Sequence, residues 1–352
     1  MKQVLITGAT GFIGAQLVRL LKQQGVEVRC LVRKTSDRSR LDPYSPEYVV
    51  GELTDDNALA RAVEGCQTVF NLAGTTKSLG LRGFVRANVH GPRSVARACL
   101  KQDAKPVLVH VSSLAASGPS TSDRARQESD CEAPVSNYGR SKLMGERAVA
   151  SYADRLPISI VRPPIVLGPG DKDGFEMFQS ASRFGVHVTP GKGNGKMSVV
   201  HVDDLCQNLT AVARRGQRLT KPNPDGQGIF YVGDHHQPTY AELGRMIGKA
   251  MGLRSTRVIP IPMPALWAVS AVNQWVSKLR GRPHILNLDK TREAAAGCWT
   301  CDPGKLREQL GFQPVFSLQE RLNQTAQWYL DNGWLSAGST VTEPRKDTLS
   351  TR

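Results

Sequence analysis

The stretch Gly8-Ala9-Thr10-Gly11-Phe12-Ile13-Gly14 governs the fold expected for this chain. It joins a short apolar run, residues 3–7, to an apolar-periodic segment, residues 12–24, and so connects a predicted strand to a predicted helix. In such a turn the first glycine permits the tight bend, the second lets a pyrophosphate approach the backbone, and the third lets helix and strand pack closely. The pattern therefore predicts a dinucleotide site, with the phosphates at the helix start, formed by Gly8, Thr10, Gly11, Phe12, Ile13 and Gly14.

Outward from this loop, short β-branched runs alternate with helical segments, which is the pattern of βαβ units around a parallel sheet. We predict an α/β fold: a Rossmann-type doubly wound parallel sheet with a smaller, mostly helical C-terminal substrate-binding region. The dinucleotide-binding core covers 1–168, with later contributions near 198–234. The substrate-binding region covers 169–197 and 235–335, and a disordered tail is expected at 336–352. Strands are expected at 3–7, 26–32, 48–53, 68–73, 107–112, 158–161 and 229–232, and helices at 12–24, 57–63, 84–101 and 138–153.

The end of the second predicted strand distinguishes between the two nicotinamide dinucleotides. An acidic residue there accepts hydrogen bonds from the ribose 2′-hydroxyl of NAD. This sequence has Arg33-Lys34 instead, and the guanidinium of Arg33 can form charge-assisted bonds to the 2′-phosphate of NADP. NADP is therefore the preferred cofactor, and NAD is retained as the alternative.

A second constellation is Tyr138-Gly-Arg-Ser-Lys142. Residues four apart share a face of a helix, so the tyrosine hydroxyl and the lysine ammonium project into the same space. A fixed ammonium favours the phenolate and lowers the pKa of a nearby tyrosine. The motif gains specificity from Ser112-Ser113, which ends a predicted strand at the sheet edge where doubly wound folds bind ligands.

Glycine loop, strand-end serine and Tyr–Lys helix, in this order, resemble the extended branch of the short-chain dehydrogenase/reductase superfamily, the NAD-dependent epimerase/dehydratase family. The resemblance implies that Tyr138 exchanges a proton with the substrate oxygen, that Lys142 lowers the pKa of Tyr138, and that Ser113 hydrogen-bonds the same oxygen. It further implies that Asn88 supports a proton-relay water. Cofactor contacts are implied at Glu52, Leu53, Leu72, Ala73, Gly74, Tyr138, Lys142, Pro163 and Ile165.

Departures from the family patterns reduce the number of reactions that the chain is expected to catalyse. Sugar-nucleotide dehydratases usually place an acidic residue after the catalytic Ser or Thr, whereas Leu114 and Ala115 follow Ser113. Sugar-nucleotide epimerases carry an acidic residue where Arg33 stands. With Arg162-Pro163, the chain is most similar to the dihydroflavonol reductase and 3β-hydroxysteroid dehydrogenase group. We predict ketone–alcohol interconversion by hydride transfer on a bulky, largely apolar substrate of steroid, flavonoid or polyketide type. A sugar-nucleotide epimerase and a non-catalytic NADP-binding protein are the alternatives.

The composition of the chain indicates in which cellular compartment it works and which kinds of partner it binds. The formal net charge is +15 over 352 residues, but the basic residues are scattered and no nucleic-acid recognition module is visible, so no nucleic-acid partner is expected. The seven cysteines are spread out and odd in number, which favours a reducing compartment over a disulfide framework. No residues have convincing metal-ligand spacing, and no metal is expected. An apolar run that starts within the first few residues leaves no room for a signal peptide, so a cytoplasmic location is expected.

Residues 265–282 form an apolar, helix-like segment with a basic end, and three interpretations of it stay open. It is a core helix whose basic end is solvated, an apolar wall of the substrate site, or an interfacial helix in peripheral contact with an anionic membrane. The family resemblance also implies a homodimer.

Overall fold

A computed structural model describes residues 1–281 and 287–335. The predicted tail, 336–352, lies outside the described residues. Within them, seven strands form one all-parallel sheet in the order β10-β6-β5-β4-β1-β2-β3. Strand order reverses between β1 and β4, which is the topological switch point of a doubly wound sheet. The strands are β1 (Gln3–Thr7), β2 (Glu27–Val32), β3 (Glu47–Val50), β4 (Thr68–Asn71), β5 (Val107–Val111), β6 (Ile158–Arg162) and β10 (Ile229–Tyr231).

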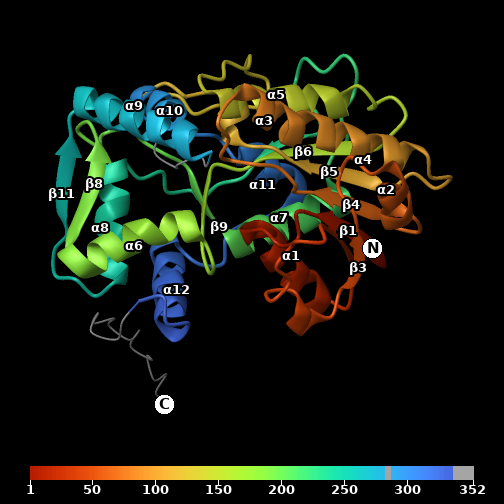
Figure 1. Cartoon of the computed structure of the whole chain (residues 1–352), viewed down its shortest axis with the longest axis horizontal. Helices are drawn as coiled ribbons and strands as arrows, with labels where there is room; N and C mark the ends of the chain where they lie inside the picture. Colours follow the sequence, from red (N-terminus) through yellow and green to blue (C-terminus); the bar gives the residue numbers. More distant parts are fainter. Residues whose placement is uncertain (282–286, 336–352) are drawn as a thin grey trace.

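Helices cover both faces of this sheet (Figure 1). On one face, α1 (Phe12–Gln23), α7 (Val202–Arg215) and α11 (Gly304–Leu310) bury their apolar residues in one cluster with alternate residues of the strands. On the other face, α2 (Asp56–Val63), α4 (Gly91–Leu100) and α5 (Asn137–Ala150) contribute to a second cluster. Covering both faces explains why the strands read as nearly continuous apolar runs.

A third apolar cluster holds the C-terminal part together, beside the sheet. It is contributed mainly by α6 (Lys172–Phe184), α8 (Tyr240–Ala250) and α12 (Leu318–Asp331). A two-stranded parallel sheet of β8 (Val186–Pro190) and β11 (Arg257–Ile261) lies at the outer end, and a shorter pair joins β7 (Ile165–Leu167) to β9 (Val199–His201). From β11 the chain enters α9 (Met263–Arg280), and α10 (Leu288–Ala295) packs against α9.

The fold class predicted from the sequence is confirmed, with differences at element ends. The third strand stops at Val50 instead of residue 53, because the chain turns there into the N-cap of α2 at Asp55. The helix predicted at 84–101 begins earlier, at Leu81, and is interrupted by a π-helical turn, η2 (Arg86–His90). The short strands β7, β8, β9 and β11 are not predicted by the sequence patterns.

Two termini of helices follow a local sequence signal. Thr239 and Ser317 each accept a hydrogen bond from the backbone of the glutamate three residues later, and that glutamate bonds back to the cap. Such capping boxes satisfy two free amides at a helix start, so α8 and α12 begin where the sequence encodes it. Among the described residues, no helix combines the length and apolarity that crossing a bilayer requires.

Candidate active site

The glycine loop has the geometry that its sequence predicts. Gly8 has φ +72°, and a Cβ built on it would lie 2.7 Å from the backbone nitrogen of Ala73, so no side chain fits there. A Cβ on Gly14 would overlap the carbonyl oxygen of Gly8. Gly11, the N-cap of α1, has an ordinary φ of −75°, and only the Gly8 oxygen approaches the place that a Cβ would take, at 3.2 Å. Two of the glycines therefore permit close backbone packing, while the third leaves open space.

This open space fits the phosphates of a dinucleotide. No side chain caps the start of α1, and its first turn contains no acidic residue. The amides of that turn lack intrahelical acceptors, and the positive end of the helix dipole favours an anion. Leu72, Ala73 and Gly74 follow β4 directly, and the backbone of Ala73 lies against Gly8. The residues present therefore fit a pyrophosphate at α1 with the rest of the cofactor running along the ends of β1 and β4.

Basic side chains gather in the loop after β2. Arg33 is exposed, directly after the strand, and its backbone N–H donates to Ser36. The same loop carries Arg38, whose guanidinium lies 4.8 Å from the centre of the Tyr48 ring, and Arg40, whose guanidinium packs against Gly170. The sequence analysis singled out only Arg33. The three arginines between residues 33 and 40 would have allowed a wider cationic surface to be predicted from the sequence.

The other predicted cofactor contacts occupy the same edge of the sheet but have different surroundings. Glu52 is exposed, whereas Leu53 packs toward Gly91 at the start of α4. Pro163 is buried after β6, and its carbonyl accepts the backbone N–H of Leu114. Ile165 is partly exposed at the start of β7. Their contacts with a cofactor stay predictions.

Ser113 and Tyr138 are brought together by two different elements. Ser113 follows β5 and caps the short helix η3 (Leu114–Ala116), while Tyr138 lies in the first turn of α5. Their side chains hydrogen-bond each other. Burial raises the pKa of Tyr138 above its ordinary value of 10, and the Lys290 ammonium and the Ser113 hydrogen bond only partly offset this. The tyrosine is therefore a neutral hydroxyl at neutral pH.

Lys142 lies one turn further along α5, with its side chain buried. Its ammonium donates to the carbonyl oxygen of Val111 at 2.9 Å, at the end of β5. Burial lowers the pKa of Lys142 to about 8, although Glu146 opposes the shift. Lys142 thus faces the end of the sheet near Gly74, where an added Cβ would lie 3.8 Å from the Lys142 nitrogen. The group that lowers the pKa of Tyr138 most in this arrangement is Lys290, and the effect implied for Lys142 stays a prediction.

Asn88 lies in the π-helical turn and is completely buried. Its side-chain oxygen accepts the backbone N–H of Thr75 at 2.8 Å, and its amide nitrogen donates to the Thr75 carbonyl and to Ser141. The Asn88 side chain therefore fixes the segment after β4 to α5, the helix that carries Tyr138 and Lys142. A π-helical turn at a functional site is a recurrent feature of proteins. A relay water at Asn88 stays a prediction.

Helix α10 supplies polar residues that the sequence analysis missed. Asp289 accepts the backbone N–H groups of Asn137 and Tyr138 at 2.7 and 3.0 Å, and Glu293 accepts the Ser136 hydroxyl at 2.6 Å. The ammonium of Lys290 lies 5.2 Å from the centre of the Tyr138 ring and pairs with Glu293 at 2.8 Å. No local motif marks these residues, because their partners lie about 150 positions earlier in the chain.

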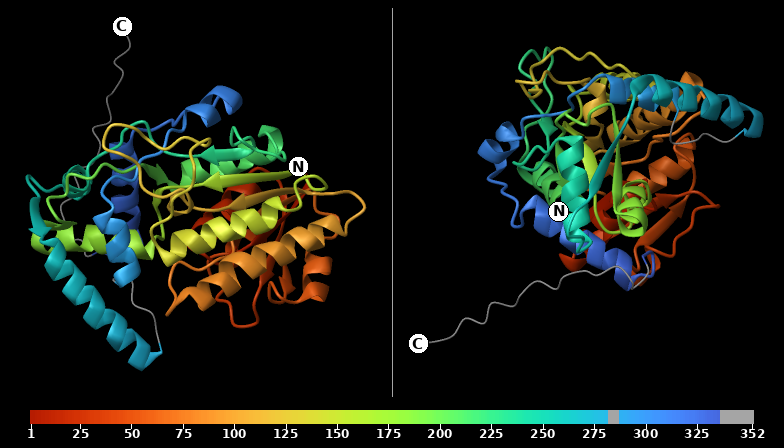
Figure 2. Two further views of the ribbon diagram at one scale, coloured as in Figure 1. Left: turned by 90° about the horizontal axis from the view of Figure 1, so that it is seen from above. Right: turned by 90° about the vertical axis from the view of Figure 1, so that its left-hand side faces the viewer.

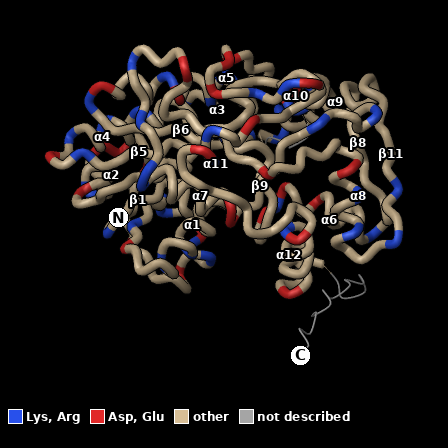
Figure 3. Tube along the Cα trace, turned by 180° about the vertical axis from the view of Figure 1, so that it is seen from behind, with Lys and Arg blue, Asp and Glu red and all other residues tan. Residues whose placement is uncertain are grey.

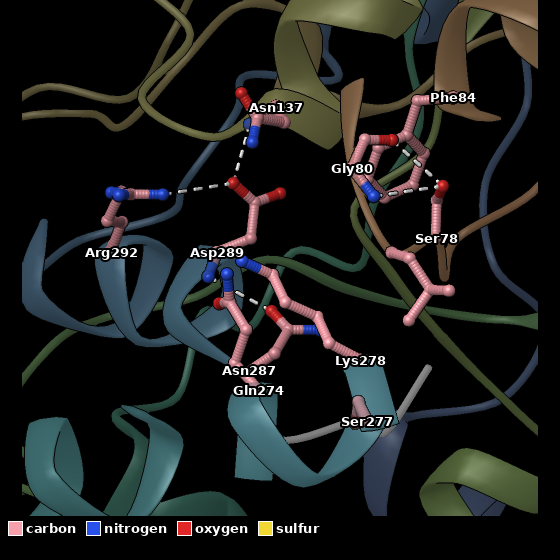
Figure 4. Close-up of a pocket in the computed structure, with 11 residues that line it drawn as sticks. Ser78, Gly80, Phe84, Asn137, Gln274, Ser277, Lys278, Asn287, Asp289 and Arg292 are labelled. Atoms are coloured by element: carbon pink, nitrogen blue, oxygen red, sulfur yellow. Dashed lines mark hydrogen bonds and ion pairs between the residues drawn. The ribbon is translucent and has the colours of Figure 1, made fainter. Parts of the chain in front are cut away.

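A small cavity of about 50 Å³ lies beside Tyr138. Figure 4 shows its walls, which come from α3 (Leu81–Val85) and the loop before it, from the start of α5, and from α9 and α10. Phe84 lines it and lies 6.0 Å from the Tyr138 ring, centre to centre. Gln274, Ser277 and Lys278 of α9 form the opposite wall. Helices α9 and α10 of the C-terminal region therefore form one side of a cavity next to Phe84 and Asn137.

The loop between Ala115 and Asn137 is also fixed in place. Ser120 and Arg126 donate backbone hydrogen bonds to the carbonyls of Cys298 and Thr300 at 3.0 and 2.9 Å. The Cys298-Trp-Thr-Cys301 segment thus pairs with the loop as extended backbone. Among the described residues no group of three or more His, Cys, Asp or Glu is arranged to hold a metal ion.

A cofactor cradle at the switch point, beside a serine–tyrosine pair and a buried lysine, defines a nicotinamide-dependent oxidoreductase of the short-chain dehydrogenase/reductase type. Comparison with known proteins agrees with this class. Residues 4–232 match the NAD dependent epimerase/dehydratase family, and the chain belongs to that family. It is an enzyme of the family's extended short-chain dehydrogenase/reductase type.

Curated relatives align along nearly the whole chain. A ceramide reductase from Caulobacter vibrioides is 33% identical over 334 residues, which cover 94% of this chain and 96% of the relative. A decarboxylating sterol-4-alpha-carboxylate 3-dehydrogenase from Candida albicans is 24% identical, with 93% and 97% covered. Among solved structures, a dTDP-glucose 4,6-dehydratase from Streptomyces venezuelae with NAD and TYD bound has a TM-score of 0.74 at 23% identity, with 94% and 98% covered. That structural likeness supports the fold.

Proposed function

We propose that this enzyme reduces a ketone to a secondary alcohol on a bulky, largely apolar lipid-like substrate, with NADPH as the preferred cofactor. The observation that carries the proposal is the hydrogen-bonded Ser113–Tyr138 pair, in which burial raises the pKa of the tyrosine. A tyrosine that keeps its proton at neutral pH is suited to donating it to a substrate oxygen. The ceramide reductase and sterol dehydrogenase relatives support an apolar substrate.

Each residue of the site would have a separate role in the reduction. When bound, a reduced nicotinamide would supply the hydride to the carbonyl carbon. Tyr138 donates its hydroxyl proton to the carbonyl oxygen, and Ser113 donates a hydrogen bond to the same oxygen, which stabilises the negative charge that develops there. The Lys142 ammonium is directed toward the ends of β4 and β5, and this direction supports a role in holding the ribose next to the reacting ring.

The residues after Ser113 favour reduction over dehydration. Leu114 and Ala115 are buried and apolar, so the chain offers no acid at the position from which a dehydratase would protonate a leaving hydroxyl. In the cavity near Tyr138, buried Phe84 and exposed Leu79 offer apolar contacts to a substrate, while the rest of the lining is mostly polar.

The cationic loop after β2 supports the choice of NADPH. Arg33, Arg38 and Arg40 lie in this loop, and the nearby Asp37 accepts the backbone N–H of Ser39. A guanidinium bonded to the 2′-phosphate contributes about 1.5–3 kcal/mol, which is roughly a factor of 10 to 100 in affinity. NADH has no 2′-phosphate and would not gain this contribution.

A paired titration with NADPH and NADH, followed by nicotinamide fluorescence, tests the cofactor. Turnover is then measured with long-chain and steroid ketones and, for comparison, with UDP-glucose. We expect NADPH to bind at least tenfold more tightly than NADH and only the apolar ketones to be reduced. Tightly held NAD together with epimerisation of UDP-glucose would replace the proposal by the epimerase alternative. Dinucleotide binding without turnover of any substrate would support the non-catalytic one.

A further inference from the structure

Four large apolar side chains of helix α9 face away from the protein, whereas a helix of a globular core buries such side chains. Val269, Val272, Trp275 and Leu279 are 49%, 60%, 64% and 68% exposed. Their spacing of three to four residues aligns them along one side of the helix. Figure 2 shows α9 at the periphery of the molecule, projecting beyond the elements around it.

Most of the α9 residues that are buried against the protein are small and polar, and Leu266 is the apolar one. Ser270 is completely buried and hydrogen-bonds Thr291 of α10 at 2.5 Å, and Ser277 is also buried. Gln274 and Ser277 line the cavity beside Tyr138. A surface helix normally buries its apolar stripe and exposes its polar face. The reversed arrangement leaves a contiguous apolar surface that is typical of contact with a lipid or protein partner.

The charge around this apolar surface is of one sign. From residue 243 to residue 288 the sequence contains no Asp or Glu. The described part of this stretch carries six exposed basic residues, and Figure 3 shows their colour along α8, the β11 edge and the end of α9. They are Arg245, Lys249, Arg254, Arg257, Lys278 and Arg280.

From this combination we infer that α9 docks the enzyme on the surface of an anionic phospholipid bilayer, with its apolar stripe in the interfacial layer. Apolar side chains supply burial, and basic side chains supply attraction to anionic headgroups. Tryptophan is enriched at such interfaces because its ring is apolar and its N–H is polar. A second copy of this chain is a poorer occupant, since the stretch from residue 243 to residue 288 has basic but no acidic residues, and two such surfaces facing each other would repel.

The docked helix would also connect the bilayer to the active site. The outer face of α9 contacts lipid, while its inner face lines the cavity that contains Phe84, next to Tyr138. Leu79, 42% exposed, lines the same cavity as Gln274 and Lys278 and adds an exposed apolar side chain there. An apolar substrate could then pass from the membrane to the proton donor over a short route. The docking itself does not depend on the proposed reaction.

The test is co-sedimentation of the full-length chain with vesicles, without dinucleotide or ketone. One set contains phosphatidylcholine, and the other contains equal parts of phosphatidylcholine and phosphatidylglycerol. We expect binding to the second set only, and weaker binding as salt increases, because salt screens the attraction. Failure of the proposed reaction would leave this measurement unchanged, so the two proposals can fail separately.

Two pairs of variants separate the contributions. Lys278→Glu with Arg280→Glu should weaken binding at least about 25-fold, while the matched reversal of exposed Lys101 and Lys105 should leave it unchanged. Val272→Ser with Trp275→Ser should weaken it about tenfold or more. Val315→Ser is the control, because Val315 is 76% exposed and lies before α12. Circular dichroism checks that each variant is folded.

Three results would overturn the inference: no binding to anionic vesicles, equal loss in test and control variants, or an effect confined to self-association. The last would appear in sedimentation velocity as a dimer that Val272→Ser with Trp275→Ser dissociates, with no change in vesicle binding. It would make α9 an interface between copies of this chain.

Discussion

The carboxylate of Asp289 accepts the backbone N–H of Tyr138 at 3.0 Å, so the helix that presents the proton donor is capped by a residue 151 positions later in the chain. The same carboxylate accepts the N–H of Asn137. An anion at a helix N-terminus is stabilised by free amides and by the helix dipole. Because α10 packs on α9, this contact joins the C-terminal region to the position of Tyr138.

Replacing Asp289 by Ala should therefore lower both stability and activity. Loss of two charge-assisted bonds is expected to reduce the free energy of unfolding by about 1–3 kcal/mol. We expect kcat to fall more than cofactor affinity, since α5 shifts but the glycine loop does not. Urea unfolding, steady-state kinetics and dinucleotide titration measure these changes. Asp289→Asn keeps an acceptor and should recover most of the activity, and equal damage by Asn and Ala would argue against the capping role.

Replacing Lys290 by Met should shift the pH dependence of catalysis. The ammonium favours the phenolate of Tyr138, so its removal raises the pKa of Tyr138 further. In the direction of alcohol oxidation, which requires the deprotonated tyrosine, the rate should then rise at a higher pH than in the parent enzyme.

The pH profile of kcat/KM for alcohol oxidation measures the shift. Lys290→Arg keeps the positive charge and should retain the parent profile. A merely structural role for Lys290 would lower the rate at every pH without moving the profile, and that outcome would contradict the electrostatic one.

The glycine loop permits a separation of stability from cofactor binding. Gly8→Ala places a Cβ 2.7 Å from the Ala73 nitrogen at φ +72°, so this variant should lose stability as well as affinity. Gly11→Ala has an ordinary φ and only one close atom, at 3.2 Å, so it should melt within a few degrees of the parent. It should nevertheless bind NADPH at least about tenfold more weakly, because its methyl group occupies the phosphate space. Normal NADPH affinity in Gly11→Ala would place the pyrophosphate elsewhere.

The parts of the site that could be predicted are those encoded locally. Gly8, Gly11 and Gly14 lie in one turn, and Tyr138 and Lys142 lie on one helix. The spacing of these residues in the sequence is therefore enough to predict how they are arranged in space. The contribution of Asp289 and Lys290 could not be predicted, because α10 is an eight-residue helix without a motif and meets α5 only in the folded chain. The outward apolar face of α9 could not be predicted either, because apolar residues occur on most sides of this helix and do not indicate which side meets the core.

The short strands β8 and β11 could not be predicted because the feature that permits them is also set by tertiary structure. β8 and β11 contain five residues each, and both include proline, which normally argues against a paired strand. Pro190 ends β8, while Pro260 lies within β11, which pairs only with β8. An edge position tolerates proline because one side of the strand needs no partner, and this context is set by tertiary structure.

Asp171 offers a test of stability against pH. It caps α6 by accepting the Asp173 N–H, and it is 7% exposed. Burial raises its pKa from 3.8 to about 6, although backbone hydrogen bonds and Lys77 oppose the shift. Below about pH 4 the carboxyl is protonated in both the folded and the unfolded chain, so its titration does not affect stability. Between about pH 4 and pH 6 the unfolded chain loses this proton while the folded protein keeps it, so stability falls over this range, and above about pH 6 the loss is complete.

Asp171→Asn should remove this pH dependence, because Asn caps a helix equally well and carries no charge. At pH 8 the variant should be more stable than the parent by on the order of 2 kcal/mol, and near pH 4 the two should coincide. Urea unfolding at several pH values measures the difference. Asp55→Asn serves as the control, since Asp55 also accepts a backbone N–H as the N-cap of α2 but is exposed, so the stability of this variant should follow the parent curve. If Asp171→Asn were instead less stable than the parent at pH 8, the charged carboxylate would be contributing more as a helix cap than its burial costs.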